Sequence, residues 1–254
     1  MSKNPWWTTL YDQHLAEILL VRHDPDELKA TLLFLRRHLR LEPGMRVFDQ
    51  CCGIGSIAIP LAQQGFQVAG CDLGQGYIER AQEEALRHGV GVDLHHADAF
   101  VFVPQSPCDA AFNWWTSFGY ADSDAENLEM LRRAFEALKV GSVFALDFMN
   151  VPGVLRSFQP TVKTERDTPR GIIRLTRSSS VDVLTMRMLK TWSYALPGGE
   201  ALEHKSSVRL YTPRELRELF TLAGFVNLRF FGNLHDQPLT LESPRCLVIG
   251  ERAA

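Results

Sequence analysis

The sequence lacks the features that mark several large classes of protein. No apolar run approaches the roughly 20 residues that a membrane-spanning helix needs, so we expect no membrane partner. The 27 Lys and Arg residues are outnumbered by 30 Asp and Glu, and the net charge of -3 argues against a nucleic-acid partner. The first residues are polar and aromatic, unlike a signal peptide, and we therefore expect a cytoplasmic protein.

Cysteine is scarce and never forms a Cys-x-x-Cys pair. The five cysteines are an odd number, which does not suit a closed disulfide framework. Without paired Cys or His ligands we expect no metal site, and we interpret the cysteines as buried reduced thiols.

The most informative stretch runs from Met45 to Leu73. A short apolar strand ends in Asp49, a turn with Gly53 and Gly55 follows, and a helix leads to a second strand that ends at Asp72. Glycine lets a backbone approach a ligand closely. Ligands of open α/β sheets bind at the carboxyl ends of the strands. The turn and Asp72 are therefore predicted on one binding edge.

Similar units continue along the chain. Apolar spacing predicts helices over 6–40 (with a new start after Asp24-Pro25), 56–64, 76–88, 127–138 and 212–224. Alternation predicts further strands at 66–71, 90–96, 108–114, 142–148, 225–231 and 245–250. Strands alternating with helices indicate a doubly wound, mainly parallel sheet.

Residues 161–211 break this pattern. Alternating segments at 162–165, 172–176, 183–194 and 202–211 are separated by turn signals at Pro169-Arg170-Gly171 and Pro197-Gly198-Gly199, which is typical of an antiparallel sheet. The predicted fold is a Rossmann-like α/β domain with an N-terminal helical cap and an antiparallel β lid. We predict a cap over 1–44, a ligand-binding core over 45–150, the lid over 151–211 and completion of the core over 212–254.

Acids follow three successive strands. Asp49, Asp72 and Asp98 have no Lys or Arg among them, and a carboxylate beside the glycine turn would repel pyrophosphate but attract a cation. Asp72 stands where a ribose-binding acid belongs, and Asp98 with the N–H of Ala99 could read an adenine edge. Asp98 could instead cap the next segment. The pattern favours a cationic adenosine ligand, with a dinucleotide-dependent dehydrogenase as an alternative.

Asp49-Gln50-Cys51-Cys52-Gly53-Ile54-Gly55, then Asp72, then Asp98-Ala99, resembles the motif series of class I S-adenosylmethionine-dependent methyltransferases. The stretches 113–120 and 208–216 resemble the small-molecule subgroup with a β lid insertion. The resemblance implies S-adenosyl-L-methionine as cofactor, with glycines along its methionine part, Asp72 on the ribose, Asp98 at the adenine and Asn113 near the sulfonium. The predicted cofactor contacts are Tyr11, Asp49, Cys51, Gly53, Gly55, Asp72, Leu73, Asp98, Ala99, Asn113 and Trp114.

Aromatic residues after the fourth strand suggest the reaction face. Trp114, Trp115, Phe118 and Tyr120 would form a wall beside the sulfonium, since aromatic faces attract cations. The predicted catalytic residues are Asn113, Trp115, Tyr120 and His235, of which His235 is the candidate general base. Trp6, Trp7 and Tyr11 are either a hydrophobic staple or a flap over the cofactor, with Tyr11 at the ligand carboxylate.

The predicted activity is methyl transfer to nitrogen or oxygen of a small molecule in secondary metabolism, by a monomer or homodimer. One alternative uses the same cofactor as the substrate of a cyclisation. The α-amino nitrogen of S-adenosylmethionine would attack its γ-carbon, giving azetidine-2-carboxylate and methylthioadenosine. A second alternative is a cofactor-binding module without catalysis.

Overall fold

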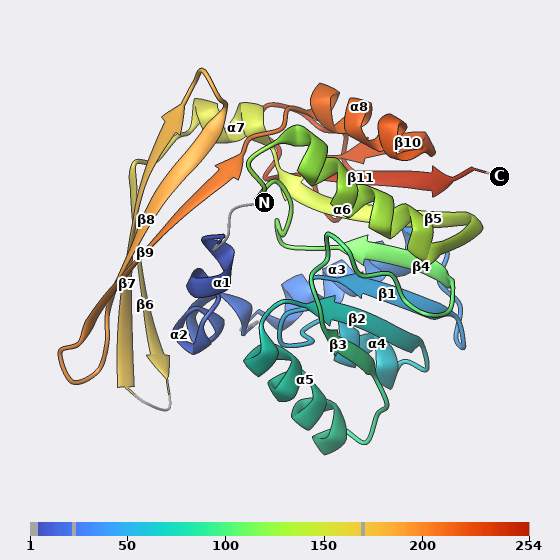
Figure 1. Ribbon diagram of the computed structural model, residues 1–254, viewed down its shortest axis with the longest axis horizontal. Helices are drawn as coiled ribbons and strands as arrows, with labels where there is room; N and C mark the ends of the chain where they lie inside the picture. The colour runs from blue at the N-terminus through green and yellow to red at the C-terminus, as the bar shows by residue number, and fades with distance from the viewer. Residues whose placement is uncertain (1–4, 22–23, 169–170, 254) are drawn as a thin grey trace.

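The main sheet has seven strands in the order β10-β11-β5-β4-β1-β2-β3 (Figure 1). The computed structural model describes residues 5–21, 24–168 and 171–253. Strands β1 to β5 run parallel, and β11 is antiparallel to both of its neighbours. The strands are β1 (Arg46–Gln50), β2 (Gln67–Asp72), β3 (Asp93–His96), β4 (Cys108–Asn113), β5 (Leu138–Met149), β10 (Phe225–Phe231) and β11 (Arg245–Arg252).

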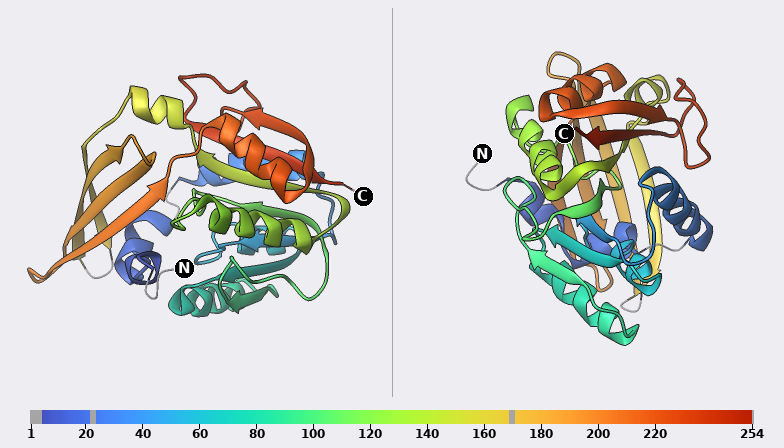
Figure 2. Two further views of the ribbon diagram at one scale, coloured as in Figure 1. Left: turned by 45° about the horizontal axis from the view of Figure 1, so that its top comes forward. Right: turned by 90° about the vertical axis from the view of Figure 1, so that its right-hand side faces the viewer.

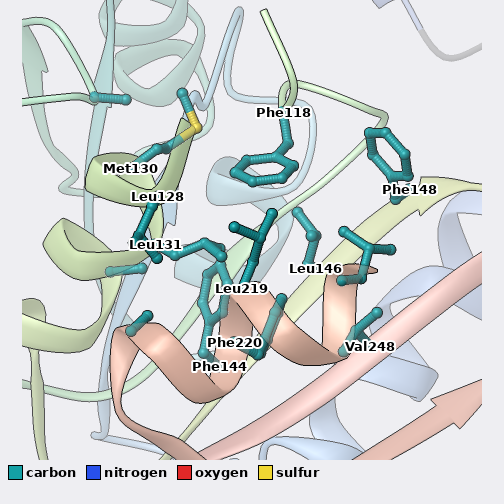
Figure 3. Close-up of a cluster of buried hydrophobic side chains, with 14 of the residues drawn as sticks. Phe118, Leu128, Met130, Leu131, Phe144, Leu146, Phe148, Leu219, Phe220 and Val248 are labelled. Atoms are coloured by element: carbon teal, nitrogen blue, oxygen red, sulfur yellow. The ribbon is translucent and has the colours of Figure 1, made fainter. Parts of the chain in front are cut away.

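Helices cover both faces of this sheet because successive strand residues point to opposite sides. In β5, Phe144 and Leu146 enter the core beneath α6 and α8, whereas Val143 and Ala145 enter the core beneath α3, α4 and α5. Figure 3 shows the first of these cores, with Phe144 and Phe220 among its buried rings. The helices are α3 (Pro25–His38), α4 (Ala58–Gln63), α5 (Gln75–Arg87), α6 (Asp124–Ala137) and α8 (Pro213–Ala223).

A second sheet of four antiparallel strands, in the order β6-β7-β8-β9, stands apart from the first (Figures 1 and 2). Its strands are β6 (Thr161–Thr168), β7 (Gly171–Asp182), β8 (Arg187–Ala195) and β9 (Ala201–Arg209), and α7 (Val151–Arg156) leads into it. The N-terminal elements lie between the two sheets, where Leu10, Leu15 and Ile18 pack on Leu175 and Tyr194 of the lid. These elements are α1 (Trp7–Leu10), α2 (Gln13–Leu15) and the π-helix η1 (Ala16–Leu20).

The predicted fold class is confirmed, and several helix boundaries follow the predicted caps. The Asp24 side chain accepts hydrogen bonds from the first N–H groups of α3. At α8, Thr212 and Glu215 form a capping box, and Gly224 closes the helix in a left-handed conformation.

Other boundaries were wrong for local reasons. Of the helical stretch predicted over 6–40, the part after Asp24 is observed as α3, whereas the earlier part is divided into α1, α2 and η1 among the described residues. Helix α6 begins at Asp124 rather than 127 because Ser123 forms a capping box with Glu126. The strand predicted from Val90 begins at Asp93, because the Val90 N–H completes the turn after α5. Residues 183–186 form a turn around the Asp182 side chain rather than strand.

Some predictions on the chain's organisation are not decided by the structure. The turn predicted at Pro169-Arg170 and residues 22–23 of the first predicted helix lie outside the described residues. The four boundaries drawn for cap, core, lid and completion also stay predictions.

The junction after α8 gives a test of packing. Gly224 has φ +102°, and a Cβ there would lie 2.9 Å from the Phe135 ring. Gly224→Ala should therefore lower the free energy of unfolding by about 1–3 kcal/mol more than a substitution whose only cost is the positive φ of the backbone. Gly44→Ala is that control, because Gly44 has φ +88° with nothing within 4 Å of its Cβ position. Equal losses in urea unfolding would contradict the clash with Phe135.

Candidate functional site

Two cavities lie at the carboxyl ends of the parallel strands. The first has a volume of about 310 Å³ and the second about 340 Å³. Both are within the range of small-ligand sites. They meet at four residues that line both, namely Tyr11, Cys51, Ser117 and Tyr120. A ligand that extends past these residues would have parts of different chemistry in the two cavities.

Asp72 lines the first cavity and is held by two backbone N–H groups. Its Oδ2 accepts from Gly53 N at 2.9 Å, and its Oδ1 accepts from Gly74 N at 2.8 Å. Burial raises the pKa of the Asp72 carboxyl, and these two bonds oppose that rise. A carboxylate has about four lone-pair sites, so acceptor capacity remains for hydroxyl groups in the cavity. Leu73, beside it, also lines the first cavity.

The glycine turn uses its N–H groups internally. Cys51, Gly53 and Gly55 all have positive φ, at 65°, 53° and 77°. The Gly53 N–H is bound to Asp72, and the Gly55 N–H donates to the Cys52 carbonyl at 3.0 Å. A Cβ on Gly55 would lie 3.1 Å from Ile59, so this glycine serves close packing and lines neither cavity. The turn thus offers little to a pyrophosphate, which binds through such N–H groups.

Asp49 is a buried acid close to this turn. It is 3% exposed, and among the described residues no hydrogen bond to its carboxylate opposes the effect of burial. Burial raises the pKa of its carboxyl well above the usual value, and the charge of Asp72 raises it further. Asp49 lines neither cavity. A cation brought near this acid would favour its charged form.

Asp98 and Ala99 line the first cavity next to Asp72. The Asp98 side chain also accepts from Phe100 N at 2.9 Å, and its carbonyl accepts from Val101 N and Phe102 N. The capping role considered from the sequence is therefore present together with the position in the cavity wall.

The N-terminal aromatic residues close both cavities from the lid side. The hydroxyls of Tyr11 and Tyr120 are hydrogen-bonded, and Tyr120 donates to the Thr116 carbonyl at 2.8 Å. The Trp6 ring packs on Tyr120 at 4.7 Å and the Trp7 ring packs on Phe100 at 6.0 Å. Burial raises the pKa of both tyrosines, so both hydroxyls stay protonated near neutral pH.

A strained turn after β4 carries Trp114 and Trp115, two of the tryptophans that line the second cavity. Trp115 and Thr116 both have left-handed φ, at 57° and 64°, which is a costly conformation for a β-branched residue. Asp147 holds the turn, because its Oδ2 accepts from Trp115 N at 2.9 Å and its carbonyl accepts from Thr116 N. Arg245 in turn pairs with the Asp147 carboxylate at 2.8 Å. Strain fixed in this way is common where a ligand is positioned.

Two predicted catalytic residues lie away from the cavity walls. Asn113 is fully buried, and its amide donates to Gln50 at 3.2 Å. His235 is exposed on the loop before β11, where its N–H donates to Asn233. Neither residue lines a cavity, and their roles stay predictions.

Several wall residues were not predicted from the sequence. In the first cavity they are Thr8, Gly74, Phe100, Ser117 and Met130. In the second they include Lys190, Trp192, Ser206, Val208 and Arg245. One signal was available, because the alternation in β8 places Lys190 in a stripe with Met188 and Trp192. A lysine within an apolar stripe is unusual and deserves notice.

Other kinds of site find little support in the part of the chain that the structure describes. Residues 5–21, 24–168 and 171–253 contain no group of three or more His, Cys, Asp or Glu placed to hold a metal ion. Among the described helices, none combines the length and apolar character that crossing a membrane requires.

Comparison with known sequences gives a family for the core. Residues 47–141 match a family model described as a methyltransferase domain. The 23S rRNA (uracil(1939)-C(5))-methyltransferase RlmD of Alkalilimnicola ehrlichii is 37% identical over 70 residues, which are 27% of this chain and 16% of that protein. The chain thus spans less than a fifth of the length of this curated relative.

Solved structures share the fold over nearly the whole chain. The CcbJ methyltransferase from Streptomyces caelestis superposes with a TM-score of 0.79 at 19% identity, covering 97% of this chain and 99% of that one. SAM-bound CalS10, an amino pentose methyltransferase from Micromonospora echinaspora, gives a TM-score of 0.67 at 20% identity, covering 90% and 91%. At these identities the likeness concerns the fold, and with the family match it confirms the resemblance seen in the sequence.

The burial of Asp49 predicts a stabilising substitution. A carboxyl whose folded pKa is raised loses stability as pH climbs from its unfolded pKa, near 3.9, through its folded value. Asp49→Asn should therefore raise the free energy of unfolding of the ligand-free protein at pH 7 by about 1 kcal/mol or more, since one pKa unit equals about 1.4 kcal/mol. The gain should vanish below about pH 4 in urea unfolding.

Asp109→Asn serves as a control of opposite sign. Burial raises the pKa of the Asp109 carboxyl, but the hydrogen bonds from Lys139 and the Arg46 N–H, with the charge of Lys139, together lower it below its usual value. The charged form of Asp109 is thus favoured in the folded protein, and Asp109→Asn, which removes that charge, should destabilise the protein at pH 7. Destabilisation by Asp49→Asn as well would refute the account of Asp49.

Proposed function

We propose that this chain, whose residues 47–141 form a methyltransferase domain, is a class I S-adenosylmethionine-dependent methyltransferase that modifies nitrogen or oxygen of a small molecule. The observation that carries the proposal is the pair of cavities that meet at Tyr11, Cys51, Ser117 and Tyr120, with Asp72 anchored in the wall of the first. One cavity suits the adenosine part of the cofactor, and the other suits its methionine part and the acceptor.

The residues present fit the cofactor. Asp72 would hold the ribose hydroxyls through its remaining lone pairs, and Asp98 with Ala99 would meet the adenine edge in the same cavity. Gly53, in the wall of the second cavity, has φ 53° and leaves room for the methionine part. Asp49 is a buried acid with a raised pKa, and a positively charged ligand nearby would relieve the cost of ionising it.

The bound cofactor supplies a methyl group on a positively charged sulfur. The chain contributes position and exclusion of water. The rings of Tyr11 and Tyr120 stand where the cavities meet and would attract a cation, by about 0.5–2 kcal/mol each. The turn at Trp115 and Thr116, fixed by Asp147, would hold the acceptor at the junction of the two cavities. Proximity and orientation of this kind supply much of the rate of a displacement reaction.

Two observations support a small acceptor. The chain carries a net charge of -3, and residues of the lid and of the N-terminal elements line part of the second cavity. CalS10, which shares the fold, is an amino pentose methyltransferase. RlmD, by contrast, is a 23S rRNA methyltransferase of which this chain matches only 16%. The setting of secondary metabolism and a monomeric or homodimeric state belong to the proposal.

Binding of S-adenosylhomocysteine tests the cofactor site. Asp72→Ala should weaken binding by at least about tenfold in isothermal titration calorimetry, because a hydrogen bond to a charged group contributes about 1.5–3 kcal/mol. The matched control is Asp93→Ala on the neighbouring strand β3, where the carboxylate is paired with Arg46 outside both cavities. Unchanged affinity in Asp72→Ala would remove the ribose assignment.

Turnover tests the reaction. With S-adenosylmethionine and a panel of small amines and phenols, S-adenosylhomocysteine should form only when an acceptor is present. Methylthioadenosine formed from S-adenosylmethionine alone would instead favour the ring-closing alternative. Tight binding of S-adenosylhomocysteine without turnover of any kind would favour a non-catalytic module.

A further inference from the structure

The inner face of the lid carries a positive charge without a counter-charge. In β8 the residues Met188, Lys190, Trp192 and Tyr194 alternate on the side that packs toward the N-terminal elements and the core. Directly opposite Lys190 stand Ser179 on β7 and Ser206 on β9, and neither supplies a negative charge.

Lys190 is a cation in the wall of the second cavity that has no anionic partner among the described residues. It lines that cavity, and among the described residues it makes no ion pair and no hydrogen bond. Its amine lies 5.6 Å from the centre of the Trp192 ring, which is a cation–π contact. Burial, together with the smaller effect of the positive charge of Arg177, lowers the pKa of Lys190 to about 8. An anion bound beside Lys190 would favour the charged amine and raise its pKa again.

The other charges of the cavity are already balanced. Arg245 is the second cation in its wall, and it pairs with Asp147 and lies 3.5 Å from Glu27. No Asp or Glu of the described residues lines this cavity. Lys190 is therefore its uncompensated charge, and the cavity favours an anionic group.

Four tryptophans belong to the same wall, beside aliphatic and small polar side chains. Trp6, Trp114, Trp115 and Trp192 line the second cavity, and the Trp192 indole is fixed by a 2.8 Å hydrogen bond to Ser206. Rigid indole faces favour flat, unsaturated ligands through stacking. The charge and the aromatic faces thus point to the same class of molecule.

We propose that the methyl acceptor is an aromatic carboxylate, with its carboxylate paired to Lys190 and its ring against the tryptophans of the second cavity. This rests on the proposed function, because it assigns the second cavity to the acceptor. Lys190 is then a specificity residue, which selects acceptors by charge before any transfer takes place.

Binding to the protein saturated with S-adenosylhomocysteine tests this directly. The probes are benzoate, 4-hydroxybenzoate and 4-aminobenzoate, each compared with its neutral carboxamide at pH 7 by calorimetry or ligand-observed NMR. At least one acid should bind about tenfold or more tightly than its amide, as expected for a charge-assisted hydrogen bond. Equal affinity of acid and amide in all three pairs overturns the proposal.

Variants assign the preference to one side chain. Lys190→Met should abolish the preference for the acid while leaving affinity for S-adenosylhomocysteine unchanged, and Lys190→Arg should retain it. Lys205→Met is the matched control, because Lys205 is an exposed lysine of β9 outside the second cavity. If Lys190→Met does not fold, Lys190→Gln replaces it. A preference that survives removal of the Lys190 charge overturns the assignment.

The two proposals fail in different ways. If S-adenosylhomocysteine itself does not bind, the proposed function fails. If it binds and the acids show no advantage over the amides, only the choice of acceptor fails.

Discussion

The carboxylate of Asp72 is the constraint on which the site depends. It ends β2, and by accepting from Gly53 N and Gly74 N it fixes the glycine turn after β1 and the start of α5 at once. Burying an anion is costly unless hydrogen bonds replace its water, and these two N–H groups do so. Because the Gly53 N–H is bound to the Asp72 carboxylate and the Gly55 N–H to the Cys52 carbonyl, neither donor is left for a phosphate.

Features of the fold and the site that depend on residues close together in the chain could be predicted from the sequence. Alternating strands, capped helices and acids at strand ends placed the sheet and put Asp72, Asp98 and Tyr11 at the first cavity, since each depends on a few neighbouring residues. It failed where distant segments decide. The first part of the helical stretch predicted over 6–40 breaks because its residues pack between two sheets, and Lys190 joins the second cavity only because the lid folds over the core. Burial of Asn113 likewise depends on contacts with Gln50 and Met130.

The site also holds features that oppose folding. Asp49 is a buried acid with a raised pKa, Lys190 is a cation without a counter-charge, and Thr116 is held in a left-handed conformation. Each lies near the cavities, whereas the cores on either side of the sheet are built from well-packed apolar side chains. Such local conflicts within a consistent fold are expected at functional sites, because ligands rather than neighbouring residues resolve them.

The N-terminal segment between the two sheets forms part of the wall of both cavities. Trp7 and Thr8 belong to the wall of the first cavity, Leu15 and Leu19 belong to the wall of the second, and Tyr11 belongs to both. A displacement of this short stretch therefore uncovers both compartments together. Exchange of one ligand would then be kinetically coupled to exchange of the other, through a short stretch of chain that lies before the first strand of the main sheet.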